Sequence, residues 1–531
     1  MLTSADDILF KNNVPGSRDE QGRRRIDITL EDRAALLISD AINHQVIPGL
    51  YTRNGGICQV IELDDGTGAR LAIQPVDADG LRMLLARHAA CFRTRDGRGG
   101  PIETSGLPSV AVSKAVLSQT VWEGVPGLAG VVSAPVIRRD GTLLQDPGYD
   151  QATKLYYRPA FKVDHVDGVP SLADVVAARR FIFNYVLADF AWDSHASRAN
   201  FIGLLATPLL RLYVGGLPPL GVISATTRGS GKSLLTEILN ALYGMRMNPW
   251  PSKEEEMAKS ITAILRDTSE PVIVWDNVGP FDTVDHASLA MLLTSTHWSS
   301  RVLGVSSLFT GLNDRVWCVT GNNVAVGGDI ASRSILVRLD PEMERPDLRT
   351  GFVINDLWSW LRDDTNRAEL LHALLVLAGA WLAAGAPRRD DLQMRNFSAW
   401  AQVMGGFTAY HGAMGFLDNR GEMEQADDEE TSTIAFLSKW HEKIGNEPRS
   451  AAQLIESAQV NSFNGHSIDP WDGVFPTKPD GKPFTAKGLG KFLTSRRGRI
   501  FAGWRLIGEQ SRTGVWQYRV APVEQARAGV A

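Results

Sequence analysis

The stretch GVISATTRGSGKSLLTEILNALYG, residues 221–244, decides the fold at the middle of this 531-residue chain. An apolar strand runs into a loop of glycine, serine and threonine, and a helical pattern follows. The apolar side chains on one face of that predicted helix are Leu234, Leu235, Ile238, Leu239 and Leu242. Gly244 stands where a helix commonly stops. A strand, a glycine-rich loop, Gly-Lys-Ser and a helix in this order predict a phosphate-binding loop.

The loop at residues 226–233 has the chemistry to hold a triphosphate. Glycines let consecutive backbone N–H groups surround a phosphate chain, and the helix N-terminus adds a partial positive charge. We expect Lys232 to reach the β- and γ-phosphates and Ser233 to ligate Mg²⁺, so the expected cofactors are ATP and Mg²⁺. The residues expected to bind the nucleotide are Thr227, Arg228, Gly229, Ser230, Gly231, Lys232, Ser233 and Leu234. Thr226 replaces the first glycine of the pattern, and the alternative is a glycine-rich turn before an ordinary helix.

A carboxylate follows the next apolar strand of this region. In EPVIVWDNV, Asp276 ends the run at residues 272–275, and such a residue beside a phosphate loop is expected to bind Mg²⁺. The alternative is an aspartate that caps a turn. The acid that usually follows, and that polarises the attacking water, is replaced by Asn277.

Three consecutive glutamates, Glu254, Glu255 and Glu256, are candidates for activating the water. A structural role is favoured instead. Ser252 and Glu255 have the spacing of a capping box, acids suit a helix N-terminus, and Glu255 with Lys259 forms an i,i+4 pair.

Two further features resemble parts of an ATPase site. The strand in RVWCVTGNNV ends in Asn322 and Asn323, and an amide there would sense the γ-phosphate or the attacking water; the alternative is a pair of turn residues. Arg333, in GGDIASRSILVRLD, is expected to reach a neighbouring subunit's nucleotide as an arginine finger. Arg301, in WSSRVLG, is its rival, and a surface or structural role is the alternative for both.

The segments RGSGKS, VIVWDNV, RVLG, VTGNN and GGDIASRSILVRLDP resemble, in this order, AAA+ ATPases of the superfamily 3 helicase type from phages, plasmids and integrated elements, often the helicase part of primase–helicases. The resemblance covers roughly residues 100–350. It implies a hexameric ring that hydrolyses ATP at subunit interfaces and moves along DNA, with Asn323 or Asn322 as sensor and Arg333 acting in trans. Asn277 departs from the family pattern. The loop GVSSLFTGLND also departs, because it has no lysine where the family's pore-lining hairpin offers a basic residue to DNA.

The expected fold class is α/β, with a P-loop AAA+ ATPase core, a small N-terminal α+β domain and a C-terminal winged-helix-like domain. The expected parts are a flexible N-terminus (1–25), the α+β domain (26–100), a strand-rich and then helical region (101–200), the ATPase core (201–345), a helical lid or connector (346–417), an acidic linker (418–430), the winged-helix-like basic domain (431–520) and a tail (521–531).

Basic residues gather near the C-terminus of a chain whose net charge is −5. In TAKGLGKFLTSRRGR we expect a helix, followed by a two-stranded wing, and a winged helix would place that helix against a DNA backbone. The residues expected to bind DNA are Lys487, Lys491, Arg496, Arg497 and Arg499. Contacts with protein are the alternative.

Composition sets the remaining bounds. With 44% hydrophobic and 22% charged residues, the chain has an ordinary globular composition. Its scattered cysteines, Cys58, Cys91 and Cys318, favour neither a disulfide framework nor a zinc site, so a cytoplasmic setting without a membrane is expected. The apolar run at residues 370–386 predicts a buried helix. Asp77 and Asp79 are spaced like a primase–polymerase metal pair but are better interpreted as a helix start.

The leading hypothesis is an ATP-dependent DNA helicase or replication-initiator ATPase of a mobile element. Its expected partners are further copies of the chain in a hexamer, DNA as a single strand or a replication fork, and a primase or another replication protein. The alternatives are a non-translocating AAA+ switch ATPase in defence or assembly, and a nucleotide-gated scaffold that hardly hydrolyses ATP.

Overall fold

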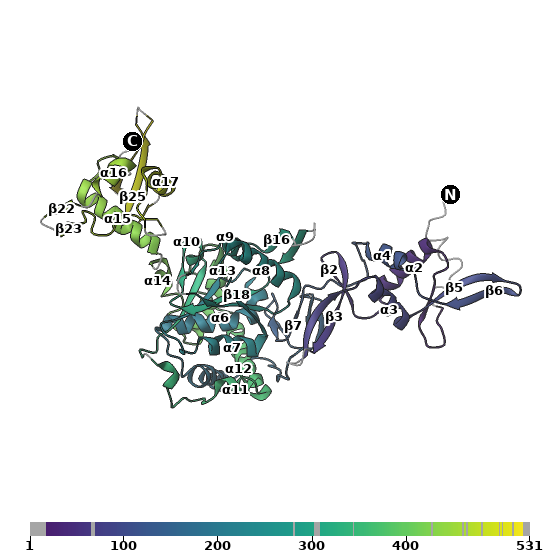
Figure 1. Cartoon of the computed structure of the whole chain (residues 1–531). Coiled ribbons are helices and arrows are strands. Elements are labelled where there is room, and N and C mark those ends of the chain that lie inside the picture. The colour runs from purple at the N-terminus through teal and green to yellow at the C-terminus, as the bar shows by residue number, and fades with distance from the viewer. Residues whose placement is uncertain are drawn as a thin grey trace. The chain divides into compact units, whose positions relative to one another are not determined.

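The computed structural model describes residues 17–523 except 65–68, 280–281, 302–307, 344, 426–427, 459–460, 464–465, 479–481, 499, 502 and 512–513. The chain forms two compact units, drawn in Figure 1. The first comprises residues 1–324 and 332–419, and the second comprises residues 325–331 and 420–531.

A five-stranded parallel sheet lies at the centre of the first unit, in the order β13-β14-β18-β12-β20. All of β12 is buried, and so are the first four residues of β14, because helices cover both faces of a parallel sheet. This confirms the expected α/β class of the core. The strands are β12 (Leu220–Ala225), β13 (Met245–Pro249), β14 (Val272–Val278), β18 (Val316–Asn322) and β20 (Ser334–Leu339).

The helix predicted after the phosphate loop is α7 (Lys232–Tyr243). Four of its five predicted apolar side chains are fully buried, and Leu234 is half-buried. Gly244 ends the helix with a φ of +77°, a conformation that glycine adopts without strain. The apolar run at residues 370–386 forms the buried part of α12 (Asp364–Ala383), as predicted.

Other helices pack around the sheet or come after its last strand in the chain, and several are seen around β18 in Figure 1. They are α6 (His195–Val214), α8 (Glu254–Asp267), α9 (Ala287–Thr294), α11 (Leu357–Trp360) and α13 (Ser398–Tyr410), with the 3-10 turns η2 (Pro346–Leu348) and η3 (Arg395–Phe397). Short elements join the core strands: β15 (Thr283–Val284), the antiparallel hairpin of β16 (His297–Arg301) and β17 (Leu308–Leu312), β19 (Ala325–Val326) and α10 (Gly328–Ala331).

Helix starts agree only in part with the sequence predictions. Helix α8 begins at Glu254 with Lys253 as its N-cap and no side-chain cap, so the predicted capping box of Ser252 and Glu255 is wrong. The reason is register: Ser252 lies one residue before the N-cap position, where its hydroxyl does not cap the first turn. By contrast, Asp77 caps α3 (Ala78–His88) by accepting from the Gly80 N–H at 2.7 Å, in line with its interpretation as a helix start.

The N-terminal part of the first unit has its own core, which runs from Ile26 to Val125 and so continues past residue 100. Residues 110–117 form a helix where we expected strands, because Ser109 caps it and Val112 and Val116 are buried in that core. Its sheets have the orders β1-β5-β6 and β2-β3-β4. The elements are β1 (Arg24–Asp27), α2 (Glu31–Asn43), β2 (Leu50–Arg53), β3 (Gly56–Asp64), β4 (Ala69–Pro75), α3, β5 (Ala89–Gly97), β6 (Gly100–Ser105) and α4 (Val110–Leu117).

Short strands and one long helical segment lead into the core. The segment begins as α5 (Leu172–Phe181) and continues as the π-helix η1 (Ile182–Val186), a form that often marks functional sites. The strands are β7 (Gly130–Val132), β8 (Val136–Ile137), β9 (Leu143–Leu144), β10 (Gly148–Asp150) and β11 (Leu155–Tyr157).

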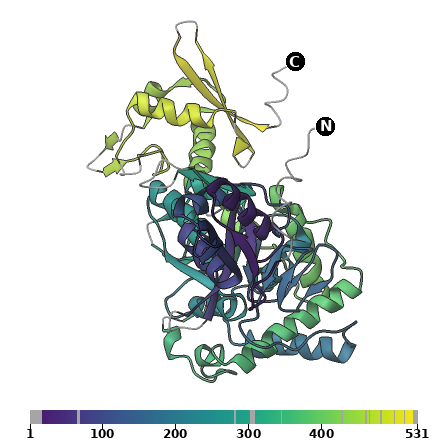
Figure 2. The ribbon, with the colours of Figure 1, turned by 90° about the vertical axis from the view of Figure 1, so that its right-hand side faces the viewer.

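The second unit contains helices packed on a four-stranded sheet of order β21-β26-β25-β24 (Figure 2). Two helices cover most of the stretch expected to be an acidic linker. The buried core of the second unit includes Trp440, Trp471, Leu489, Leu493 and Tyr518. The elements are α14 (Arg420–Gln425), α15 (Asp428–Ile444), β21 (Arg449–Ser450), α16 (Ala451–Ser457), β22 (Asn461–Phe463), β23 (His466–Ile468), α17 (Ala486–Arg496), β24 (Ile500–Phe501), β25 (Trp504–Gln510) and β26 (Trp516–Pro522).

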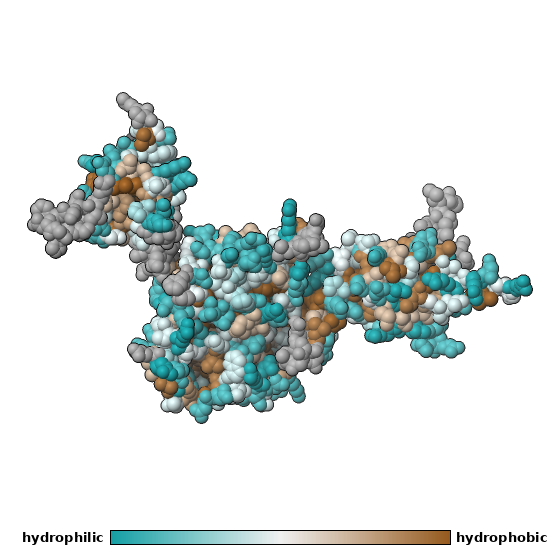
Figure 3. All heavy atoms as spheres, in the orientation of Figure 1, coloured by the Kyte–Doolittle hydropathy of each residue, from teal (hydrophilic) through white to brown (hydrophobic). Residues whose placement is uncertain are grey.

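Hydrophilic and intermediate residues cover most of the face that Figure 3 shows of the sheet-containing core. Across the described residues, no helix combines the length and apolar character needed to cross a membrane.

Candidate functional site

The carboxyl ends of β12, β18 and β14 bring the predicted site together at one edge of the sheet. β18 lies between the other two strands, so a residue at its tip is a neighbour of both the phosphate loop and Asp276. Ligands of open parallel sheets bind outside the carboxyl ends of the strands, where the chain order is interrupted. Here β12, the first of the five strands in the chain, lies in the sheet between β18 and β20, which are the last two in the chain.

The phosphate loop is shaped by two glycines with positive φ, +77° at Gly229 and +95° at Gly231. Gly231 is the N-cap of α7, which leaves the first N–H groups of that helix directed at the loop. Thr226, where the pattern normally has glycine, ties the loop to the end of β20: its hydroxyl donates to Asp340 Oδ1 at 3.0 Å. The Ser230 hydroxyl donates to the Thr227 carbonyl at 2.6 Å and so closes the turn.

Lys232 crosses from this loop to the neighbouring strand. Its Nζ donates to Asn322 Oδ1 at 2.6 Å. Burial lowers the pKa of Lys232, and the charge of Asp276 acts in the opposite direction. The ammonium group is therefore partly shielded from water, and it lies near two other predicted site residues, Asn322 and Asp276.

Asp276 is half-buried in β14, two residues before the strand ends at Val278, and the Thr320 hydroxyl donates to its Oδ1. Ser233 is exposed at the start of α7. Among the described residues, no group of three or more His, Cys, Asp or Glu side chains could hold a metal. One carboxylate and one hydroxyl nevertheless fit Mg²⁺, which takes most of its ligands from phosphates and water.

The two asparagines at the tip of β18 have different environments. Asn322 contacts Lys232. Asn323 has a φ of +48°, its N–H donates to the Ala225 carbonyl at 2.9 Å, and its side chain is exposed. The Asn322 side chain thus meets Lys232, whereas Asn323 Nδ2 donates to the Thr226 carbonyl of the phosphate loop at 3.4 Å.

The candidate arginine finger Arg333 does not lie beside the phosphate loop of its own chain. Arg333 precedes β20, whose first residue pairs with Leu220 and whose last pairs with Ala225, so Arg333 and the loop are at opposite ends of adjacent strands. Its Nη1 donates to the Ala290 carbonyl on α9. Arg301 is exposed at the last position of β16.

The three glutamates at the start of α8 have other partners. Glu254 Oε1 accepts from the Ser288 N–H at 2.9 Å, in the first turn of α9. Glu255 and Glu256 pair with Lys259 at 2.7 and 2.9 Å. These contacts agree with the structural role favoured above.

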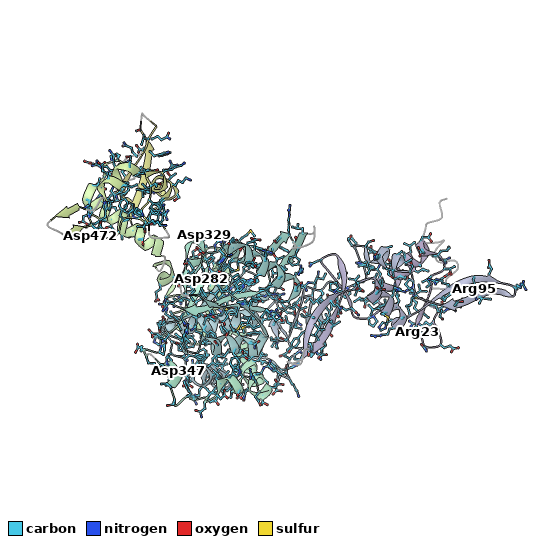
Figure 4. The ribbon with its side chains drawn as sticks, in the orientation of Figure 1. Arg23, Arg95, Asp282, Asp329, Asp347 and Asp472 are labelled. Atoms are coloured by element: carbon cyan, nitrogen blue, oxygen red, sulfur yellow. The ribbon has the colours of Figure 1, made fainter. Side chains whose placement is uncertain are left out.

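A cavity of about 130 Å³ adjoins the phosphate loop. Its walls include Gly229, Ser230, Gly231 and Leu234 of the loop and α7 start, together with Phe190, Arg349 and Phe352. Arg349 stacks on Phe352 with its guanidinium 5.1 Å from the ring centroid. Asp347, labelled in Figure 4, lies in the same segment, against Gly229. These residues come from segments far apart in the sequence, so no local pattern marks them.

The basic residues of the second unit are not equivalent. Lys487 and Lys491 are exposed, one helical turn apart on α17. Arg496 instead stacks on Phe492, 3.8 Å from its ring centroid, and Arg497 stacks on Trp516 at 4.5 Å. Arg499 lies outside the described residues.

No protein-family model matches the chain, and no curated protein sequence matches it. Among solved structures, it is similar to the apo form of the NrS-1 C-terminal region, at 13% identity over 79% of this chain and 92% of that one, with a TM-score of 0.34. A structure described as SCCmec type IV Cch, active helicase, matches at 11% identity over 91% of this chain and 98% of that one, with a TM-score of 0.33. JCV helicase matches at 12% identity over 48% and 72%, with a TM-score of 0.21. Likenesses this low carry no conclusion about this chain.

Proposed function

We propose that the chain is an Mg²⁺- and ATP-dependent DNA helicase or replication-initiator ATPase of a phage, plasmid or integrated mobile element, working as a hexameric ring. The observation that carries the proposal is the contact of Lys232 with Asn322 next to Asp276. A phosphate-loop lysine, a magnesium carboxylate and a sensor amide at three adjacent strands are among the parts that ATP hydrolysis requires.

Each residue of this edge has a proposed task. Loop N–H groups and Lys232 bind the phosphates, Ser233 and Asp276 hold the metal, and Asn322 orients the terminal phosphate or the attacking water. Mg²⁺, when bound, neutralises charge that develops on the phosphate oxygens. The cavity beside the loop takes the nucleoside, because aromatic rings and a stacked guanidinium suit the flat face of a base.

Hydrolysis at an interface requires a residue from the neighbouring subunit. Arg333 is the proposed finger. Its distance from its own phosphate loop, at the opposite end of adjacent strands, agrees with action in trans. Arg301, exposed at the end of β16, is the rival finger, and it also supplies a basic residue to the hairpin that lacks the family's lysine.

DNA is the proposed polymer substrate. In the second unit, the three helices α15, α16 and α17 with a β25–β26 wing have the element order of a winged helix. The exposed pair Lys487 and Lys491 is proposed to contact phosphates. A primase or another replication protein is the proposed further partner.

ATP turnover with and without single-stranded DNA tests the proposal. We expect DNA to stimulate turnover several-fold and Lys232→Ala to abolish it. Turnover that DNA leaves unchanged would instead support the non-translocating switch. A specific observation favours the third candidate, a nucleotide-gated scaffold: Asn277 stands where an acid would activate water. ATP binding with background turnover would establish that alternative.

A further inference from the structure

The strand that carries Asp276 is irregular at the site itself. Trp275 of β14 pairs with Val319 of β18, but the next pair is Val278 with Gly321. Three steps along β14 thus match two along β18. Asp276 and Asn277 together face the single residue Thr320, which is the arrangement of a β-bulge.

Asn277 has the backbone conformation that this bulge needs. Its φ is +63°, in the left-handed region, where asparagine is among the best tolerated of the residues that have a side chain. Its side chain is exposed. A glutamate here would be strained, so the residue that replaces the usual acid suits the bulge.

One hydroxyl group holds both residues of the bulge. Thr320 is 2% exposed, and its Oγ1 accepts from the Asn277 N–H at 3.2 Å. A hydroxyl has a single proton to donate, and this proton goes to Asp276 Oδ1. Oδ1 therefore already accepts a hydrogen bond, and this bond fixes the orientation of the carboxylate.

We propose that Thr320 is a positioning residue for Asp276: through the bulge it presents the other carboxylate oxygen, Oδ2, to the Mg²⁺ that accompanies ATP. Asn277 serves this arrangement through its backbone and takes no part in proton transfer. The inference rests on the proposed ATPase function. Groups that orient metal ligands by hydrogen bonds commonly change metal affinity by about 10- to 100-fold when they are removed.

Nucleotide binding as a function of Mg²⁺ tests this without relying on turnover. A fluorescent ATP analogue is titrated into the full chain in EDTA and at increasing Mg²⁺. For Thr320→Val, which keeps the shape and loses the hydroxyl, we expect the Mg²⁺ concentration at half-effect to rise about 10-fold or more, with affinity in EDTA unchanged within about twofold. Thr320→Ser should restore the wild-type dependence.

The control is Thr207→Val. Thr207 is also a fully buried threonine, but its hydroxyl donates to the Gly203 carbonyl within α6. It should alter the thermal midpoint without altering the Mg²⁺ dependence. An unchanged Mg²⁺ dependence in Thr320→Val, or an equal loss of affinity in EDTA, overturns the positioning role. If the wild-type chain binds no ATP analogue at all, it is the ATPase function that fails.

Variants of Asn277 provide a second test of the same proposal. Asn277→Gly keeps the positive φ at low cost and should retain turnover within about threefold. Asn277→Val puts a β-branched residue in that region and should raise the Mg²⁺ requirement as Thr320→Val does. Loss of turnover in Asn277→Gly with normal Mg²⁺ dependence would show that the amide itself takes part, against the inference.

Discussion

Lys232 Nζ lies 2.6 Å from Asn322 Oδ1, and this hydrogen bond joins the phosphate loop to the middle strand of the site. An ammonium group that is half-desolvated by burial needs such a partner. The terminal phosphate of ATP would offer the same lysine a stronger one. Because Asn322 is already within reach of the lysine, its amide is placed to contact whatever the lysine binds.

Replacing Asn322 should therefore affect hydrolysis more than binding. For Asn322→Ala we expect kcat to fall about 100-fold, the cost typical of losing one preorganised polar contact to a transition state, with ATP affinity within about threefold. Asn323→Gly is the matched control, because glycine accepts the φ of +48° at that position. Steady-state turnover and equilibrium binding of an ATP analogue separate the two effects. The opposite ranking would make Asn323 the sensor.

The strand ends of this site were predictable because the carboxyl ends of parallel strands share one edge of a sheet. Lys232, Asp276 and Asn322 each follow or end an apolar run, and the structure brings them together. Thr320 was not predictable, because its role depends on a bulge in register that no local sequence pattern specifies. The aromatic walls of the cavity come from the turn after η1 and from the segment after β20, and only the tertiary fold brings Phe190 and Phe352 to one cavity.

The contribution of Lys487 and Lys491 to DNA binding should appear in how the affinity for DNA depends on salt concentration. Replacing Lys487 and Lys491 together by glutamine removes two exposed cations. If both contact phosphates, the slope of log affinity against log salt should fall by about two units for the full chain binding to DNA. Fluorescence anisotropy with a labelled oligonucleotide measures it.

Arg496 is the control for that experiment. Its guanidinium stacks on Phe492, so Arg496→Ala should lower the thermal midpoint and leave the salt slope unchanged. A slope that responds to Arg496 and not to the two lysines would place the DNA on another face.

The acid stability of the first unit should depend on His411, which is 2% exposed and lies at the end of α13. Its Nε2 is 3.0 Å from the Leu377 carbonyl, and burial, with a smaller effect from Arg179, lowers its pKa from 6.5 to about 4. The folded protein thus keeps His411 neutral where the unfolded chain takes up a proton. Its contribution to stability is complete above pH 6.5 and is lost as the pH falls towards 4.

The lost free energy is about 2.5 kcal/mol between pH 7 and pH 4.5. His411→Gln keeps a donor for the carbonyl and cannot titrate, so its thermal midpoint should fall less over this range than that of the wild type. Parallel curves for the two proteins would show that another group dominates acid unfolding.

Trans action by Arg333 predicts a result that a purely structural arginine cannot give. Arg333→Ala and Lys232→Ala should each abolish turnover alone, the first without weakening ATP binding. Mixed in equal amounts, they should recover about a quarter of wild-type turnover per subunit, because some interfaces combine an intact lysine with an intact arginine from the neighbouring chain. If the mixture stays inactive while Arg301→Ala complements Lys232→Ala, the finger is Arg301. If neither pair complements and Arg333→Ala lowers the thermal midpoint, Arg333 has a structural role, to which its bond to the Ala290 carbonyl contributes.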